Sequence, residues 1–219
     1  MDRLSDVGVL DKSIALLRSV AAGASSLAEL VAATGVPRAT GHRLLVALEA
    51  HGLVRRDAGG RFAPGFALMA LGAAAADAFP LATAAGPALA RLRDETGESA
   101  QLYVRQGDRR ICVASLDAPR ELRTIVPVGA ALPLDRGSAG KVLRDDPVIG
   151  RSGWAESVAE REIGVASVSA PVLDAAGVVV AAVSVSGPIE RLTRRPGRRY
   201  GGAVVGAARR IETTMGFLG

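Results

Sequence analysis

The chain has 219 residues, of which 49% are hydrophobic, and its 27 basic and 22 acidic side chains give a net charge of +5. A single cysteine, Cys112, excludes an internal disulfide and a zinc site built from cysteines. No apolar run is long enough to span a bilayer and the first residues lack the apolar core of a signal peptide, so we expect a cytoplasmic protein with no membrane partner.

The first part of the chain predicts three helices. A helix over residues 9–21 has its apolar side chains at helical spacing. A second helix begins after Ser26, which stands three residues before Glu29 in the spacing of a capping box, and it stops at Gly35. Pro37 opens a third helix. Its predicted inner face consists of Gly41, Leu44, Leu45 and Leu48. The short turn between the last two helices indicates a helix-turn-helix.

A basic hairpin follows, because residues 53–62 read as two short strands joined by a Gly-rich turn. Together these elements predict a winged helix-turn-helix over residues 1–65, whose last helix fits the major groove of double-stranded DNA. Between residues 38 and 61 there are five arginines against only Glu49 and Asp57, and phosphate contact needs such local positive charge. The residues expected to contact DNA are Arg38, Ala39, Thr40, His42, Arg43, Arg55, Arg56 and Arg61. Arg38 or Arg43 could pair with guanine through two hydrogen bonds, whereas the pattern leaves open whether Thr40 and His42 contact a base or a phosphate.

The rest of the chain predicts a linker and a second domain. An alanine-rich helix that Pro80 ends makes residues 66–80 a linker, either a plain connector or part of a dimer contact. In residues 81–219 we expect a helix over 81–96, a short helix over 138–144 and a closing helix over 199–215. The predicted strands are 99–106, 110–116, 122–128, 154–158, 164–173 and 178–186. Helices that flank a mostly antiparallel sheet make this an α+β domain.

Motifs in both predicted domains resemble, in the same order, the IclR-type transcriptional regulators of bacteria. The matching stretches are residues 8–13, 36–45, 53–57, 60–62, 95–99, 128–134, 164–172 and 182–188. The resemblance implies a C-terminal effector-binding domain with a GAF-like fold, and dimers or tetramers on a palindromic operator. Residues 98–102, 110–114 and 189–192 are similar to actinobacterial regulators of amino-acid metabolism that act on leucine-biosynthesis genes. That closer likeness implies an amino acid such as leucine as the effector.

The resemblance also implies a pocket. Carried over by position, it would be lined by Gln101, Tyr103, Ser138, Ala139, Lys141, Ser167, Ser184 and Ser186. Small side chains leave volume, and hydroxyls together with helix N-terminal amides can hold a carboxylate. The alternative is that these serines are merely tolerated in strands and turns.

Two departures from the family pattern stand out. Gly41 replaces a larger apolar residue, which should cost the helix about 1 kcal/mol relative to alanine. The segment 144–153 is shorter than in relatives, so part of a pocket wall or lid is expected to be absent.

Enzyme chemistry has weak support. Ser138 and Lys141 fit the S-x-x-K spacing of serine acyl-enzymes, but the accompanying S-D-N and K-T-G motifs are missing. His42 and His51 both lie in the DNA-binding domain, so we expect no metal site, no cofactor and no Ser-His-Asp triad in the second domain. The prediction is a DNA-binding transcriptional regulator. The alternatives are a ligand-sensing or assembly protein whose helix-turn-helix does not read DNA, and a serine acyl-enzyme that uses Ser138 and Lys141.

Overall fold

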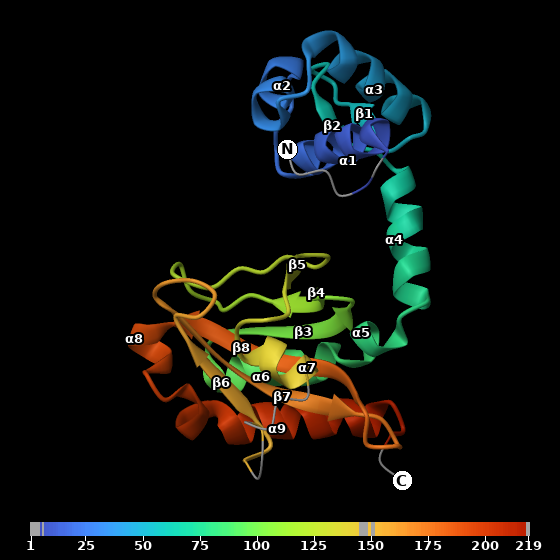
Figure 1. Cartoon of the computed structure of the whole chain (residues 1–219). Helices are drawn as coiled ribbons and strands as arrows, with labels where there is room; N and C mark the ends of the chain where they lie inside the picture. Colours follow the sequence, from blue (N-terminus) through green and yellow to red (C-terminus); the bar gives the residue numbers. More distant parts are fainter. Residues whose placement is uncertain (1–4, 6, 145–148, 150–151, 218–219) are drawn as a thin grey trace. The chain divides into compact units, whose positions relative to one another are not determined.

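The structure, a computed structural model, describes residues 5, 7–144, 149 and 152–217. It divides into two compact units, Met1–Ala78 and Phe79–Gly219 (Figure 1). Each unit has its own hydrophobic core. Most of the segment 144–153 lies outside the described residues. The prediction that part of a pocket wall or lid is absent there therefore also concerns residues outside the described ones.

The helices of the first unit are α1 (Gly8–Ala21), α2 (Leu27–Thr34) and α3 (Arg38–Ala50). The predicted capping box is confirmed: Ser26 Oγ accepts the Glu29 N–H at 3.2 Å, and Glu29 Oε2 accepts the Ser26 N–H at 3.1 Å. Gly35 ends α2 in the left-handed conformation with φ of 69°. Pro37 lies at the N-cap, one residue before the first turn of α3. The three helices enclose a core made of Leu16, Val20, Leu30, Val36, Leu45, Leu48, Val54 and Phe62.

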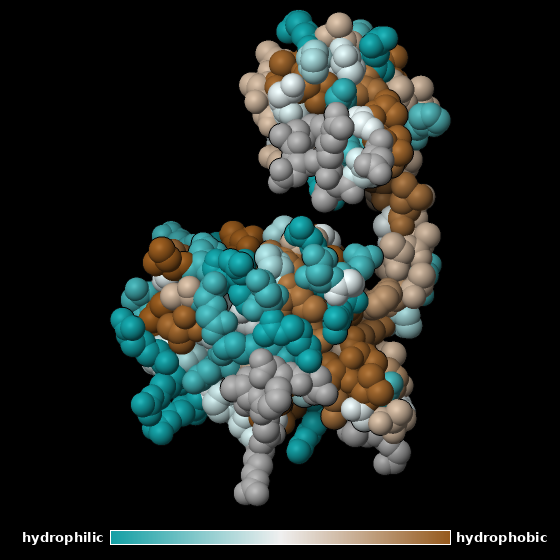
Figure 2. Space-filling model, viewed as in Figure 1, coloured by the Kyte–Doolittle hydropathy of each residue, from teal (hydrophilic) through white to brown (hydrophobic). Residues whose placement is uncertain are grey.

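The predicted hairpin is present as β1 (Val54–Arg56) and β2 (Phe62–Pro64), which pair antiparallel. Val54 and Phe62 attach it to the helical core, because both side chains are buried there. The following helix α4 (Ala67–Asp77) has no buried residue. Its apolar side chains therefore lie on the surface, where α4 is coloured brown and tan (Figure 2).

Gly41, on the buried side of α3, has room for a methyl group. An ideal Cβ there would lie 3.8 Å from side-chain atoms of Leu27, Val31 and Val36, which is ordinary van der Waals contact. We expect Gly41→Ala to raise the free energy of unfolding of the first unit by about 1 kcal/mol, because alanine is the better helix former. Urea unfolding followed by circular dichroism measures the change. The matched control Gly35→Ala should destabilise, since the left-handed conformation disfavours a side chain, and a less stable Gly41→Ala protein would contradict the prediction.

The helices of the second unit are α5 (Pro80–Ala84), α6 (Gly86–Thr96), α7 (Ser138–Leu143), α8 (Ile189–Leu192) and α9 (Pro196–Thr214). Its strands are β3 (Ser99–Gln106), β4 (Arg109–Leu116), β5 (Ala131–Pro133), β6 (Ala155–Val158), β7 (Val165–Leu173) and β8 (Val179–Pro188). They form a six-stranded sheet in the order β5-β4-β3-β8-β7-β6, and the described pairs are antiparallel.

Two predicted elements of this unit were wrong. The helix expected over 81–96 is two helices, because Pro87 has no N–H to donate and occupies the first turn of a new helix instead. The strand expected over 122–128 is absent among the described residues. The alternation of polar and apolar residues in this segment matches the burial of Thr124 and Val126. The strand that pairs with β4 at this edge of the sheet is β5 instead.

Side-chain alternation gives the sheet two different faces. One face carries apolar residues such as Leu102, Val168 and Val183, which pack under α6 and α9 in the main core. The opposite face lies against α7, and Tyr103 and Ala182 belong to a smaller core there. Strand register also places serines of β7 and β8 on this second face.

Candidate functional site

The outer side of α3 presents most of the residues expected to contact DNA. Arg38, Ala39, His42 and Arg43 are exposed, and Thr40 is half-buried. Within the described part of the chain, neither Arg38 nor Arg43 has an ion-pair or hydrogen-bond partner. Their guanidinium groups are therefore available to an external anion.

The arginines of the hairpin are engaged to different degrees. The Arg55 guanidinium lies 5.3 Å from the centre of the Phe66 ring and stays exposed. Arg56 Nε lies 3.4 Å from a carboxylate oxygen of Glu49, so its charge is partly neutralised.

Arg61 takes part in closing the tip of the hairpin. Its Nη2 lies 3.0 Å from Asp57 Oδ2, while Asp57 Oδ1 accepts the N–H groups of Gly59 and Arg61 at 2.9 Å. These backbone hydrogen bonds, that of Arg61 first, lower the pKa of Asp57. Among the residues expected to contact DNA, the positive charge without a carboxylate partner in the described residues thus lies on Arg38, Arg43 and Arg55.

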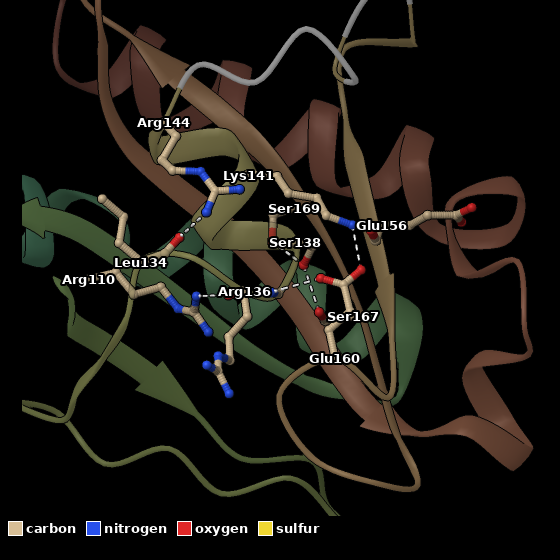
Figure 3. A network of polar contacts seen from close by, with 11 residues as sticks. Arg110, Leu134, Arg136, Ser138, Lys141, Arg144, Glu156, Glu160, Ser167 and Ser169 are labelled. Atoms are coloured by element: carbon tan, nitrogen blue, oxygen red, sulfur yellow. Dashed lines mark hydrogen bonds and ion pairs between the residues drawn. The ribbon is translucent and has the colours of Figure 1, made fainter. Parts of the chain in front are cut away.

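A pocket opens on the serine-rich face of the sheet, next to α7. It is lined by Tyr103, Arg110, Gly137, Ser138, Ala139, Ser157, Arg161, Val165, Ser167, Ser184 and Ser186. The lining includes all of the residues expected from the family resemblance except Gln101 and Lys141. Gln101 is fully buried beneath it and accepts a hydrogen bond from Ser186 Oγ at 3.0 Å. Lys141 Nζ instead donates to Glu160 Oε1 at 2.5 Å and to the Glu156 carbonyl at 2.9 Å (Figure 3).

A chain of serine hydroxyls forms the floor of this pocket. Ser138 Oγ lies 2.7 Å from Ser167 Oγ and 2.8 Å from Ser169 Oγ (Figure 3). Ser169 Oγ in turn donates to Ser184 Oγ at 2.8 Å. Among the described residues, no lysine, histidine or carboxylate hydrogen-bonds Ser138. The Ser138 and Lys141 pair of a serine acyl-enzyme is therefore not assembled.

The sequence analysis missed five residues of the lining: Arg110, Gly137, Ser157, Arg161 and Val165. Arg110 is the more deeply buried of the two arginines among them. It is only 4% exposed, and its Nη1 donates to the carbonyl oxygens of Pro133, at 2.8 Å, and Arg136. Burial lowers its pKa. Its guanidinium also lies 5.5 Å from the centre of the Tyr103 ring, and burial raises the pKa of that phenol. The alternation of β4 would have placed Arg110 on the same face as the buried Cys112.

Two glycines let α7 approach Arg110 closely. Gly137 precedes the helix with φ of 84°, and an ideal Cβ there would lie 3.1 Å from Arg110 Nη2. A Cβ on Gly140 would collide with the carbonyl oxygen of Leu134. The start of α7 can therefore lie against the Arg110 guanidinium because these two positions are glycines; any larger residue would be too close to its neighbours there.

The described residues contain no group of three or more His, Cys, Asp or Glu side chains placed to hold a metal ion. Among the same residues, no helix has the length and apolar character needed to cross a membrane.

Comparison with known proteins adds to this geometry. The IclR helix-turn-helix domain matches residues 9–58, and the bacterial transcriptional regulator IclR C-terminal domain matches residues 73–145 and 147–213. The glycerol operon regulatory protein of Streptomyces griseus is 32% identical over 217 residues, which cover 84% of this chain and 85% of the relative. The HTH-type transcriptional repressor AllR of Escherichia coli K12 is 27% identical over 244 residues, covering 95% of this chain and 90% of the repressor.

Solved structures share the fold. The IclR protein of Thermotoga maritima aligns with a TM-score of 0.77 at 22% identity, covering 96% of this chain and 99% of that one. An IclR homologue of Microbacterium hydrocarbonoxydans, complexed with 4-hydroxybenzoate, aligns with a TM-score of 0.76 at 19% identity, covering 94% of this chain and 98% of that one. Because matches to both domains span most of the sequence, the chain belongs to the IclR family of bacterial transcriptional regulators.

Proposed function

We propose that α3 reads a specific operator and that a small molecule bound in the second unit changes operator affinity. The observation that carries the first claim is the pair of exposed guanidinium groups on α3, Arg38 and Arg43, which have no partner among the residues that the structure describes. The other side of this helix is buried. Such groups can pair with guanine or phosphate oxygens. The likeness of residues 98–102, 110–114 and 189–192 to actinobacterial regulators of leucine biosynthesis supports amino-acid metabolism as the target.

We also propose a homodimer, alone or as half of a tetramer. In the first unit, α4 and the residue before it expose Phe66 (72%), Met69 (72%) and Leu71 (61%), and α1 exposes Val9 (60%) and Leu10 (52%). Apolar surface of this extent on two helices is suited to burial against a second copy. A two-fold dimer would place two α3 helices about one DNA turn apart, which requires a palindromic operator.

The pocket beside α7 is the proposed effector site. Its concave shape, small side chains and converging hydroxyls are typical of small-molecule sites. The M. hydrocarbonoxydans homologue is complexed with 4-hydroxybenzoate, which supports a small organic ligand for this chain as well. An effector regulates only if it binds the two states of the dimer unequally, and such coupling is typically about 1–3 kcal/mol.

Selection of genomic fragments by the purified full-length protein tests this function. We expect the recovered fragments to share an inverted repeat with half-sites about 10 bp apart, and their affinity to fall steeply with salt as counterions are released. Metabolites of amino-acid metabolism, leucine included, are then titrated against the recovered operator. Fragments without a common sequence would instead favour the alternative of a sensing or assembly protein whose helix-turn-helix does not read DNA.

A further inference from the structure

The charge balance of the pocket is unusual. Among its lining residues, Arg110 and Arg161 are basic and none is acidic. The other lining side chains are hydroxyl-bearing or small. The pocket therefore presents two positive charges to whatever occupies it.

Two of the three guanidinium nitrogens of Arg110 lack a hydrogen-bond acceptor among the described residues. Its Nη1 is satisfied by two carbonyl groups, but Nε is buried without a partner, and Nη2 has no hydrogen bond among the described residues. A buried guanidinium without a carboxylate partner is costly. The Asp135 carboxylate, whose charge opposes the lowering of the Arg110 pKa, is exposed and accepts a hydrogen bond from Arg136 Nε at 3.1 Å. An anion from outside would complete the set of partners.

The second arginine lies on the loop between β6 and β7. Arg161 has one ion-pair partner among the described residues, its neighbour Glu162 at 3.3 Å, whose side chain is 62% exposed. An exposed pair of this kind contributes little and competes weakly with a bound anion. The two positive charges repel each other. Burial lowers the pKa of Arg110 most, and the positive charge of Arg161 lowers it further.

Glu160 holds this loop against the start of α7. Its carboxylate accepts the Gly137 N–H at 3.1 Å and the Lys141 ammonium at 2.5 Å (Figure 3). Lys141, which the resemblance placed in the pocket, thus attaches the loop that carries Arg161. These contacts fix the backbone of the loop that carries Arg161 relative to the start of α7.

We propose that the pocket binds a short dicarboxylate, with one carboxylate held by Arg110 and the serine hydroxyls and the other by Arg161. This inference rests on the proposed function, since it names the chemical class of the effector. Two guanidinium groups match two carboxylates, and each can form short, charge-assisted hydrogen bonds. Leucine fits less well, because no lining residue is acidic and could pair with its ammonium group. Its isobutyl side chain would also find only Ala139 and Val165 as aliphatic contacts in the lining.

The size of the pocket favours a ligand of few carbons. The centre of a water molecule can reach about 20 Å³ of it, room for little more than one water molecule, whereas all its empty space, the open mouth included, is about 370 Å³. A four-carbon dicarboxylate such as succinate is an appropriate probe, because its two charges stand at opposite ends of a short chain.

Isothermal titration of the full-length protein with succinate, acetate and leucine tests the proposal. We expect succinate to bind at least about tenfold more tightly than acetate, because the second carboxylate gains a charged partner, and leucine to bind more weakly than succinate. The variant Arg161→Met should reduce succinate affinity about tenfold, to the level of acetate, and leave acetate within about twofold. The matched control is Arg109→Met, an exposed arginine on β4 next to Arg110 and outside the pocket lining, which should bind like the wild type.

The Arg110→Met variant should bind neither succinate nor acetate. Because Arg110 also donates hydrogen bonds to two carbonyl groups, circular dichroism is needed to show that this variant folds. Equal affinities for succinate and acetate, tighter binding of leucine, or an unchanged Arg161→Met protein would each overturn the dicarboxylate proposal. Operator affinity of the same preparation separates the two claims. Operator binding without succinate binding refutes only the ligand class, whereas succinate binding without operator binding supports the anion site and contradicts the proposed regulator.

Discussion

Replacing Arg43 with alanine should weaken binding to the selected operator about ten- to hundredfold, the range expected when a bidentate guanine contact is removed. Arg43 is exposed on α3 and has no internal partner among the described residues, so its loss removes binding energy without disturbing the core. Arg56→Ala should have a smaller effect, because that guanidinium is already paired with Glu49. Arg91→Ala, an exposed arginine on α6 in the second unit, is the control that should leave affinity unchanged.

Fluorescence anisotropy at several salt concentrations distinguishes the two roles open to Arg43. If it contacts a base, the variant should lose discrimination between operator and unrelated DNA and keep its salt slope. If it contacts a phosphate, binding should weaken on all sequences and the slope should fall by about 1. Wild-type affinity in the variant would mean that α3 is not the reading helix.

The second large effect is expected on stability, at the ion pair between Glu98 and Arg191. The Glu98 side chain is 2% exposed and accepts hydrogen bonds from Arg191 Nε at 2.5 Å and Nη2 at 2.8 Å. Arg191 Nη2 also donates to the Leu122 carbonyl at 2.9 Å, which ties the 117–128 loop to α8. We expect Arg191→Met to lower the free energy of unfolding by about 3–5 kcal/mol, because it leaves a buried carboxylate without its counter-charge.

Urea unfolding of the variants measures this loss. The double variant Glu98→Gln/Arg191→Met should recover much of it, since the amide removes the buried charge as well as the ion pair. Arg198→Met, an exposed arginine on α9, is the matched control and should stay within about 0.5 kcal/mol of the wild type. An Arg191→Met protein as stable as that control would show that water solvates Glu98 despite its burial.

The helix-turn-helix could be predicted in detail because its signals are local. The Ser26 and Glu29 capping box and the left-handed Gly35 depend on residues within one or two turns of the chain. The same holds for the hairpin, where Asp57 bonds to backbone groups two and four residues away.

Predictions failed in the second unit where the outcome depended on distant partners. Residues 122–128 alternate as a strand would, yet β4 pairs with β5 on that side, and alternation alone does not name a partner strand. The helix over 81–96 was a different error, because Pro87 was visible in the sequence and its missing N–H indicated a new first turn.

By itself the sequence determined the order of most elements, since capping, turn chemistry and side-chain periodicity act over a few residues, and its motifs determined the family. Only the tertiary structure decided the electrostatics of the pocket. Arg110 enters it because β4 pairs with β3 and because glycines let α7 approach, and Lys141 leaves it because Glu160, nineteen residues away, binds its ammonium. Charges that meet through the packing of distant segments leave no periodic trace in the chain, because Coulomb attraction depends on separation in space and not along the sequence.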